Sequence, residues 1–220
     1  MKYTCVLFDL DGTVLDTTAD IHSAVNRTLE EFSYPTHSPE TVASFLNNGA
    51  KVLISRSLPE NVRDNEDVLS AVLSRYIENY KACCTKDSVI YKGVYELLEK
   101  LSQNGVSLGI VTNKPHVQTE IILPHYFGNL FSYFQGNCDE LPHKPHKDRV
   151  THALCAMGKT KDETIFVGDS YVDVLTARSA DIPCIGVDWG FSGAKSFEKE
   201  IPDKIVSSAD EIFEIAKNGF

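Results

Sequence analysis

CVLFDLDGTVLD, which occupies residues 5–16, places an apolar run directly before two closely spaced aspartates. Side chains alternate along an extended strand, so Asp9 and Asp11 project on the same side of the backbone. Two carboxylates at the tip of a buried strand repel each other and lose solvation. Such a pair persists where a cation neutralises it, or where one carboxylate is a nucleophile and the other an acid or base. A strand followed by a solvated acidic turn is the alternative interpretation.

The 220-residue chain has an ordinary globular composition, with 42% hydrophobic and 24% charged residues. Its length allows one large domain or one domain with a modest insertion. The net charge of −10 and the lack of a dense Lys/Arg block argue against nucleic acid or an anionic membrane surface as the main partner. A small anionic substrate remains compatible, because a divalent cation can invert the local field.

Targeting and redox signals are absent from the sequence. The N-terminal apolar run is too short for a signal peptide, and no stretch contains 18 consecutive apolar residues. The six cysteines are scattered without a C-x-x-C pair, so we expect reduced thiols, including the adjacent Cys83 and Cys84. We therefore expect a cytoplasmic protein, either a monomer or a homodimer.

Hydrophobic spacing divides the chain into a helical run and a region in which strands and helices alternate. The helical run is predicted to contain four helices, over residues 18–32, 39–46, 50–58 and 67–81. After residue 90 we predict helices over 94–101, 115–125, 148–157, 171–179 and 209–217, and strands over 106–111, 130–135, 164–167 and 183–187. Alternation of this kind indicates βαβ crossovers in a mostly parallel sheet.

The fold class is therefore predicted to be α/β, with a doubly wound, Rossmann-like sheet and an inserted α-helical cap. The first strand belongs to the later sheet, so residues 1–16 and 86–220 form the core domain and 17–85 the cap. Ligands bind beyond the carboxyl ends of the strands in open α/β sheets. An insertion that leaves the tip of the first strand lies over that edge and can act as a lid.

Polar side chains also follow two later predicted strands. Thr112 and Asn113 come after the strand over 106–111, and they are small donors suited to an oxyanion, although both residues also favour turns. Asp169 follows the strand over 164–167, and Asp173 lies four residues further on. Helix capping is the structural alternative for these two acids. If all the strand ends converge, the four side chains share one crevice with Asp9.

A lysine is the remaining component that the sequence offers, with Lys144, Lys147 and Lys114 as candidates. Oxygen ligands without histidine or cysteine suit a hard cation such as Mg²⁺. A lysine, a threonine hydroxyl and backbone N–H groups suit a transferring phosphoryl group. Phosphate monoesters hydrolyse very slowly unaided, so their hydrolysis calls for covalent catalysis, a metal and a positioned acid together.

The order of these motifs resembles that of the haloacid dehalogenase superfamily, whose phosphatases carry D-x-D-G-T, here residues 9–13. The resemblance covers essentially the whole chain and all four motifs. It implies that Asp9 is the nucleophile that forms an aspartyl-phosphate. It implies that Asp11 protonates the leaving alkoxide and then activates water. It also implies that Thr112 and the Asn113 backbone hold phosphoryl oxygens.

The same resemblance selects Lys144, directly before Pro145, to balance charge between nucleophile and phosphate. It implies a Mg²⁺ ion on the Asp9 carboxylate, the Asp11 carbonyl and Asp169. Asp173 is expected to act through water or to orient Lys144.

Within the superfamily, the chain is most similar to the phosphoglycolate phosphatase-like subgroup with a small helical cap. Thr13 fits the phosphatase form of the first motif, residues 111–115 (V-T-N-K-P) match the second, and residues 48–53 (N-G-A-K-V-L) resemble a cap stretch. The resemblance therefore implies that Gly49 approaches the leaving group. Lys51 or Arg56 could meet a substrate carboxylate, with a solvated cap position as the alternative. Lys147 departs from the K-P-x-P form of the third motif.

The expected function is Mg²⁺-dependent hydrolysis of a small phosphorylated metabolite. A β-phosphoglucomutase-like phosphotransferase or a pyrophosphatase could use the same Asp9 and Asp11. A phosphoaccepting signalling module also gathers acids, a threonine and a lysine on a doubly wound sheet. Such modules accept phosphate on a later strand and have no helical insertion after the first one, which argues against this class.

Overall fold

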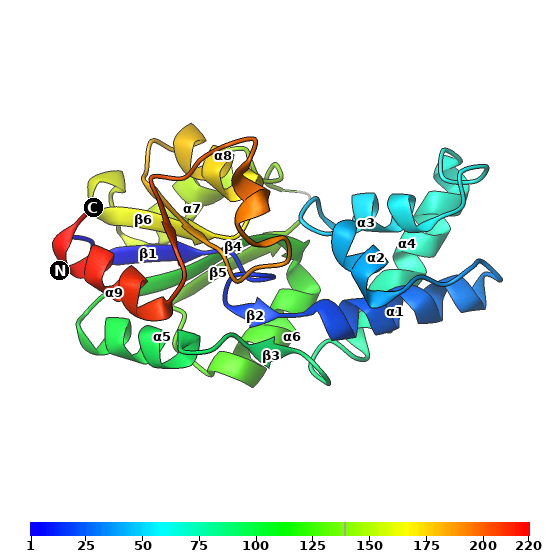
Figure 1. The fold of residues 1–220 in the computed structure, drawn as a ribbon, viewed down its shortest axis with the longest axis horizontal. Coiled ribbons are helices and arrows are strands. Elements are labelled where there is room, and N and C mark those ends of the chain that lie inside the picture. Colours follow the sequence, from blue (N-terminus) through cyan, green and yellow to red (C-terminus); the bar gives the residue numbers. More distant parts are fainter. Residues whose placement is uncertain (139) are drawn as a thin grey trace.

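The computed structural model describes residues 1–138 and 140–220, and in these ranges the main sheet has six strands. The strand order is β5-β4-β1-β6-β7-β8, and every pairing is parallel (Figure 1). The bounds are β1 Cys5–Phe8, β4 Ser107–Pro115, β5 Tyr133–Asn137, β6 Thr164–Gly168, β7 Cys184–Val187 and β8 Lys204–Val206. Because all strands run the same way, their carboxyl ends share one edge of the sheet.

β1 lies at the centre of the sheet and its side chains alternate between two cores. Val6 and Phe8 pack in one hydrophobic cluster, and Cys5 and Leu7 pack in the other. All four side chains are buried, and burial of a large apolar side chain contributes roughly 1.5–3 kcal/mol. Covering on both faces explains why this strand is continuously apolar.

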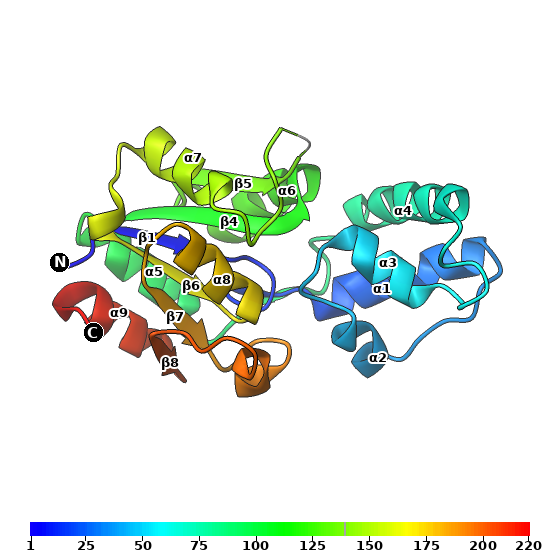
Figure 2. The ribbon, with the colours of Figure 1, turned by 90° about the horizontal axis from the view of Figure 1, so that it is seen from above.

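Helices cover both faces of the sheet (Figure 2). The cluster that contains Val6 and Phe8 also takes side chains from α5 Val94–Gln103, α6 His116–Phe127 and α9 Ala209–Asn218. The opposite cluster takes side chains from α7 Asp148–Met157 and α8 Tyr171–Ser179. The predicted doubly wound α/β arrangement is confirmed.

The four remaining helices lie together beyond the sheet, on the side of the strands' carboxyl ends (Figures 1 and 2). They are α1 Thr18–Glu31, α2 Pro39–Ser44, α3 Ala50–Ser57 and α4 Glu66–Lys81. We call this group the cap. The chain enters and leaves it through a short antiparallel ladder, in which Leu15 of β2 (Leu15–Asp16) pairs with Ile90 of β3 (Val89–Ile90). The predicted boundaries at 16/17 and 85/86 fall beside this ladder.

The sequence-based prediction missed several short elements: β2, β3, β8 and two 3₁₀ helices, Lys161–Glu163 and Gly193–Phe197. Segments of two to five residues are too short for a hydrophobic period to show. The strand over 106–111 was predicted too short, since β4 continues to Pro115 across an irregularity in its pairing with β5. Thr112, Asn113 and Lys114 therefore lie in the strand itself.

The six cysteines lie in the described ranges and are all free thiols. No helix in residues 1–138 or 140–220 is both long enough and apolar enough to cross a membrane.

Candidate active site

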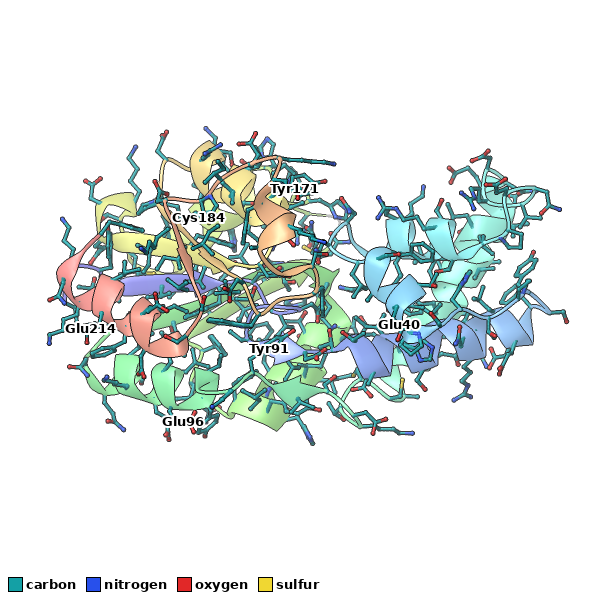
Figure 3. All side chains as sticks on the ribbon, viewed as in Figure 1. Glu40, Tyr91, Glu96, Tyr171, Cys184 and Glu214 are labelled. Atoms are coloured by element: carbon teal, nitrogen blue, oxygen red, sulfur yellow. The ribbon has the colours of Figure 1, made fainter. Side chains whose placement is uncertain are left out.

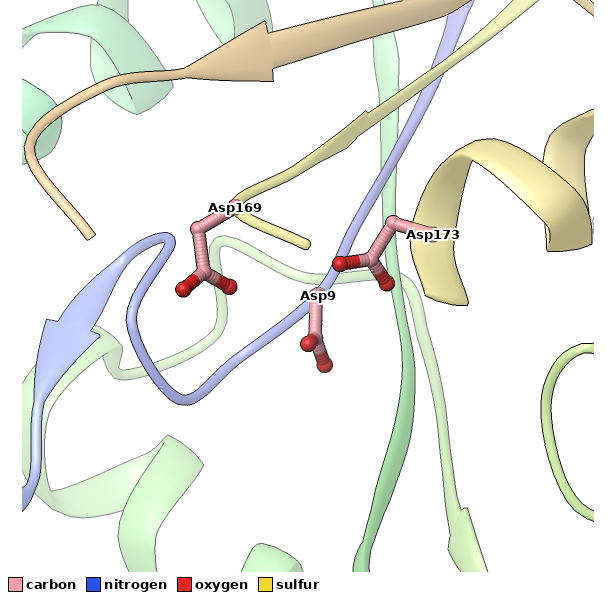
Figure 4. A group of neighbouring side chains, drawn as sticks. All are labelled: Asp9, Asp169 and Asp173. Atoms are coloured by element: carbon pink, nitrogen blue, oxygen red, sulfur yellow. The ribbon is translucent and has the colours of Figure 1, made fainter. Parts of the chain in front are cut away.

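Three carboxylates meet at the carboxyl edge of the sheet (Figure 4). Asp9 directly follows β1, Asp169 directly follows β6, and Asp173 lies in the first turn of α8. One carboxylate oxygen from each lies within 4.8 Å of the others. The backbone N–H of Asp9 donates to the Val167 carbonyl at 2.9 Å, so the β1–β6 pairing extends to the carboxylates themselves. The sequence predicted this convergence of acids.

Lys144 supplies the positive charge of the group. Its ammonium lies 3.0 Å from Asp9 Oδ1 and 2.6 Å from Asp173 Oδ1, and its side chain is 3% exposed. Burial by itself lowers the pKa of Lys144, but the charges of Asp173 and Asp9 outweigh burial and raise it to about 12. The ammonium is therefore charged throughout the physiological pH range. Of the three candidate lysines, Lys144 is the one that contacts Asp9, and Lys147 is exposed.

Asp173 has two tasks at once. Its Oδ2 accepts hydrogen bonds from the backbone N–H of Ser170 at 3.1 Å and from the Ser170 hydroxyl at 2.7 Å. These contacts form part of a capping box at the start of α8. The other oxygen, Oδ1, accepts from Lys144. Asp173 therefore caps α8 and pairs with Lys144 at the same time. The capping hydrogen bonds fix the orientation of its carboxylate, and the carboxylate in turn positions the Lys144 ammonium.

Asp169 is closely surrounded by glycine backbone. A Cβ atom at Gly12 would stand 2.4 Å from its Oδ2, and one at Gly190 would stand 2.3 Å from its Cβ. Only glycine leaves room here, and Gly12 also has a φ of +82°. Burial, followed by the charges of Asp173 and Asp9, raises the pKa of Asp169 well above its ordinary value.

The charge balance of the cluster fits a divalent cation. Asp9, Asp169 and Asp173 face one ammonium, that of Lys144, so the described side chains leave an excess of negative charge in a buried place. An all-oxygen donor set suits a hard cation, and such a cation would remove the repulsion from Asp173 and Asp9 that adds to burial in raising the pKa of Asp169.

Asp11 is separated from this cluster by a second lysine. Its Oδ1 accepts from Lys114 Nζ at 2.7 Å and from the Thr17 hydroxyl at 2.8 Å. Lys114 Nζ also donates to the Tyr80 hydroxyl of α4 at 2.5 Å. The sequence offered Lys114 only as a rival for the position of Lys144. The structure places the two lysines on different aspartates.

Thr112 and Asn113 lie beside these lysines at the end of β4. Thr112 is 2% exposed and its hydroxyl accepts from the backbone N–H of Lys114 at 3.2 Å. The Asn113 side chain bonds to the Lys144 backbone on both sides: Nδ2 donates to its carbonyl at 3.2 Å, and Oδ1 accepts from its N–H at 2.9 Å. This second role of Asn113 was not predicted.

Arg149, in the first turn of α7, was also missed. It is fully buried and its guanidinium donates to four oxygens: the carbonyls of Thr112 (3.0 Å), Leu141 (3.0 Å) and Pro142 (2.6 Å), and Asn137 Oδ1 (2.6 Å). Burial lowers the pKa of the guanidinium. Arg149 thereby ties the end of β4 to the loop that carries Lys144. A single arginine at the start of a helix gave no signal in the sequence.

An inner cavity lies between cap and core. Its charged lining comes from the core: Asp9, Asp11, Lys114 and Lys144. Its cap side is mostly apolar and includes Ile21, Leu46, Gly49, Ala50, Leu53, Tyr76 and Tyr80. Gly49 lines this cavity, and its approach to a leaving group stays a prediction.

Lys51 lies in the wider groove outside this cavity, and its ammonium pairs with Glu66 at 3.1 Å. Arg56 is turned outward and donates to the Phe45 carbonyl at 3.2 Å. Cap and core also touch at Tyr171, labelled in Figure 3 on the side of the core that faces the cap, where its hydroxyl donates to Asn48 Oδ1 at 3.3 Å.

Comparison with known proteins is consistent with this geometry. The family described as haloacid dehalogenase-like hydrolase matches residues 6–187. The phosphoglycolate phosphatase of Colwellia psychrerythraea is 31% identical over 212 residues, which cover 94% of each chain. That of Pseudomonas putida strain KT2440 is 32% identical over 211 residues, covering 91% of this chain and 75% of the relative.

Solved structures resemble this one over nearly the full length. A predicted phosphoglycolate phosphatase from Haemophilus somnus superposes with a TM-score of 0.87 at 28% identity and covers 98% of each chain. A structure of CbbY from Rhodobacter sphaeroides in complex with phosphate, 19% identical, has a TM-score of 0.77 over 96% of each chain and shares the fold.

Proposed function

The chain belongs to the haloacid dehalogenase-like hydrolase family, and we propose that its site hydrolyses a small phosphomonoester through a covalent intermediate on Asp9. The observation that carries the proposal is the pairing of Lys144 with Asp9, 3.0 Å apart in a buried site that opens into the inner cavity. A carboxylate held by an ammonium at the bottom of a cavity is suited to attack an anionic phosphoryl group.

In the first step, a carboxylate oxygen of Asp9 attacks phosphorus and the bond to the ester oxygen breaks. Asp11 gives its proton to the departing alkoxide, so the former ester oxygen leaves as a neutral hydroxyl group. Both of the hydrogen bonds described for the Asp11 carboxylate are on Oδ1, which makes Oδ2 the oxygen placed to carry the proton.

In the second step, Asp11, now ionised, takes a proton from a water molecule that attacks phosphorus. The acyl phosphate bond breaks, inorganic phosphate leaves, and the carboxylate of Asp9 is regenerated. Asp11 gives the proton that it has taken from water to the leaving alkoxide of the next substrate. The two aspartates therefore have separate duties, which accords with their separate lysine partners, Lys144 and Lys114.

Thr112 and Lys144 bind the phosphoryl oxygens during both steps. Thr112 and Asn113 line the same cavity as Asp9, and the Lys144 ammonium lies 3.0 Å from Asp9 Oδ1. Hydrogen bonds to a phosphoryl group in a site from which water is excluded are stronger than in solution.

The acidic cluster provides the place for Mg²⁺. Asp9 and Asp169 would hold the ion with the backbone carbonyl of Asp11, and Asp173 would complete its surroundings through water or through Lys144. When bound, Mg²⁺ supplies charge neutralisation and orientation for the phosphoryl group.

Phosphoglycolate is the substrate that we propose. The relatives from C. psychrerythraea and P. putida carry the name phosphoglycolate phosphatase, and the inner cavity brings Asp9, Asp11 and two lysines to one place. The mostly apolar cap side excludes water from the leaving group, and it presents few polar groups to a sugar.

The test is phosphate release by the purified protein from phosphoglycolate, with and without Mg²⁺. We expect turnover that needs the metal and that falls at least a thousandfold in Asp9→Asn, because the amide cannot form the covalent intermediate. Circular dichroism and the thermal midpoint check that the variant is folded. Phosphate release from pyrophosphate and isomerisation of a phosphosugar are measured in parallel. Fully active Asp9→Asn protein, or isomerisation without hydrolysis, would refute the proposal.

A further inference from the structure

Two lysines, Lys144 and Lys114, line the inner cavity in the described part of the chain. Lys144 is committed to Asp9 and Asp173, on the side where the phosphoryl group binds. Lys114 lies on the other side, beside Asp11, where the alcohol leaves. Its side chain is 2% exposed, so its charge acts in surroundings of low dielectric and is worth more than a surface charge.

The ammonium of Lys114 still has donor capacity. A lysine has three N–H donors, and in the described part of the chain two of them are used, by Asp11 Oδ1 at 2.7 Å and by the Tyr80 hydroxyl at 2.5 Å. The residue lines the inner cavity, as do both partners. A third donor can therefore serve a ligand in that cavity.

The cap offers this ligand mainly apolar surface. Leu46, Ala50 and Leu53 line the cavity together with Lys114 and Asp11, and Asn47 is a polar residue of the cap that also lines it. Lys51 and Arg56 are the two cations of α3, the helix that carries Ala50 and Leu53. Both are exposed and have partners outside the cavity. Selection for a charged leaving group thus falls to a lysine of the core.

We propose that Lys114 determines substrate specificity by binding a carboxylate on the leaving alcohol. This inference rests on the proposed function and deepens it. Lys114 Nζ is in contact with the carboxylate of Asp11, whose proton goes to the ester oxygen. When the ester oxygen of a substrate faces Asp11, an anionic group of the same substrate can contact Lys114 only if few bonds separate that group from the ester oxygen. The site therefore selects phosphate esters of α-hydroxy acids, in which one carbon separates the ester oxygen from the carboxylate.

Tyr80 is the positioning residue for this lysine. Its hydroxyl accepts from Lys114 Nζ, its ring lies 4.5 Å from the same ammonium, and it stacks on Tyr76 with ring centroids 5.7 Å apart. Tyr80 belongs to α4, so the cap holds the ammonium even though Lys114 belongs to the core. The cap and the core thus both contribute to the site that Lys114 forms.

The experiment compares kcat/KM for phosphoglycolate, for 3-phosphooxypropionate, which has one more carbon, and for ethyl phosphate, which lacks the carboxylate. The wild-type protein is expected to prefer phosphoglycolate to both. In Lys114→Met, the preference over ethyl phosphate should fall by about 10- to 100-fold, the size expected for losing a hydrogen bond between charged groups. Tyr80→Phe, which keeps both charges, should reduce the preference by a smaller factor, mainly through KM.

Lys161→Met is the matched control, since Lys161 is exposed and pairs with Asp181 on the surface. Its preference should equal that of the wild type. Equal losses on phosphoglycolate and ethyl phosphate in Lys114→Met would mean that the lysine only supports Asp11, and would overturn the inference. So would loss of preference in Lys51→Met instead. If Lys114→Met does not fold, Tyr80→Phe decides in the same way, because an unchanged preference there overturns the inference. Failure of the wild type to hydrolyse any of the three esters refutes the proposed function itself, a distinct result.

Discussion

The side chain of Asn113 makes two hydrogen bonds to the backbone of Lys144. Asn113 Nδ2 donates to the Lys144 carbonyl at 3.2 Å, and the Lys144 N–H donates to Asn113 Oδ1 at 2.9 Å. A side chain at the end of β4 thus fixes the backbone of the loop from which Lys144 reaches Asp9. The residues are 31 apart in the sequence.

Asn113→Ala should therefore lower kcat through Lys144. Two backbone groups lose their partner, so the ammonium is held less firmly against Asp9, and we expect a loss of about tenfold in kcat together with about 1–3 kcal/mol of unfolding free energy. Steady-state kinetics and urea denaturation measure both. Asn104→Ala removes an exposed helix-end hydrogen bond to the Lys100 carbonyl and should leave kcat unchanged. An unaltered kcat in Asn113→Ala would show that the hydrogen bonds between Asn113 and the Lys144 backbone have no part in catalysis.

Asp11→Asn should slow the departure of poor leaving groups most. General acid catalysis is worth roughly 10²–10⁴ in rate for an alkoxide, and far less for p-nitrophenolate, which leaves without a proton. The measurement is kcat/KM for phosphoglycolate and for p-nitrophenyl phosphate in the same variant. Losses of the same size on both substrates would contradict the acid role of Asp11.

Arg149→Met should destabilise the protein strongly. The guanidinium is fully buried and satisfies four oxygens, which the methionine leaves without donors. We expect a loss of about 2–4 kcal/mol in unfolding free energy, measured by chemical denaturation. Arg178→Met is the matched change at an exposed ion pair with Glu200 and should cost less than about 1 kcal/mol. Similar costs at both positions would argue against a structural role for Arg149.

Addition of Mg²⁺ should raise the thermal midpoint even without substrate, because the ion relieves the repulsion among Asp9, Asp169 and Asp173. At a hundredfold excess over Kd the stabilisation is about 2.7 kcal/mol, or roughly 5–10 °C for a chain of this size. EDTA should reverse the shift, and Asp169→Asn should abolish it. Asp162→Asn, at an exposed acid, should retain it. A full shift in Asp169→Asn would place the ion elsewhere.

Glu31 should make the cap sensitive to acid. Hydrogen bonds from Arg75 and then Asn79 lower its pKa from 4.5 to about 2. Because the folded-state pKa is the lower one, the stabilisation is fully present above pH 4.5 and is lost as the pH falls toward 2. The difference in thermal midpoint between the wild type and Glu31→Gln should be constant above pH 5 and shrink below it. A difference that stays constant to pH 2 would contradict this assignment.

The acidic centre could be predicted because each acid directly follows a buried strand or opens the next helix. Asp9 follows an apolar run, and Asp169 follows another, so both carboxylates lie at one edge of a parallel sheet, and they meet because β1 and β6 are neighbours. Helix periods were equally informative, since α1 and α4 bury one face each. Two-residue strands such as β2 and β3 carry no period, and only their pairing defines them.

Interactions of long side chains were beyond the sequence. Three lysines could have faced Asp9, and the choice depends on contacts between distant segments: Lys144 meets Asp173, 29 residues away, and Lys114 meets Asp11, 103 residues away. A lysine has four rotatable bonds, so its position in the chain says little about where its charge lies. Lys51 illustrates this, because its cap position was anticipated but its ammonium pairs with Glu66.

The amino-acid sequence by itself determined the α/β fold, the placement of the acids at strand ends and the family of the protein, because short-range patterns of burial specify strands and helices. The tertiary structure alone decided which ammonium serves which carboxylate, and that Arg149, Asn113 and Tyr80 hold these groups in place. The physical reason is that an ion pair in a buried site depends on the direction of two side chains, and this direction is set by packing between segments that are far apart in the chain.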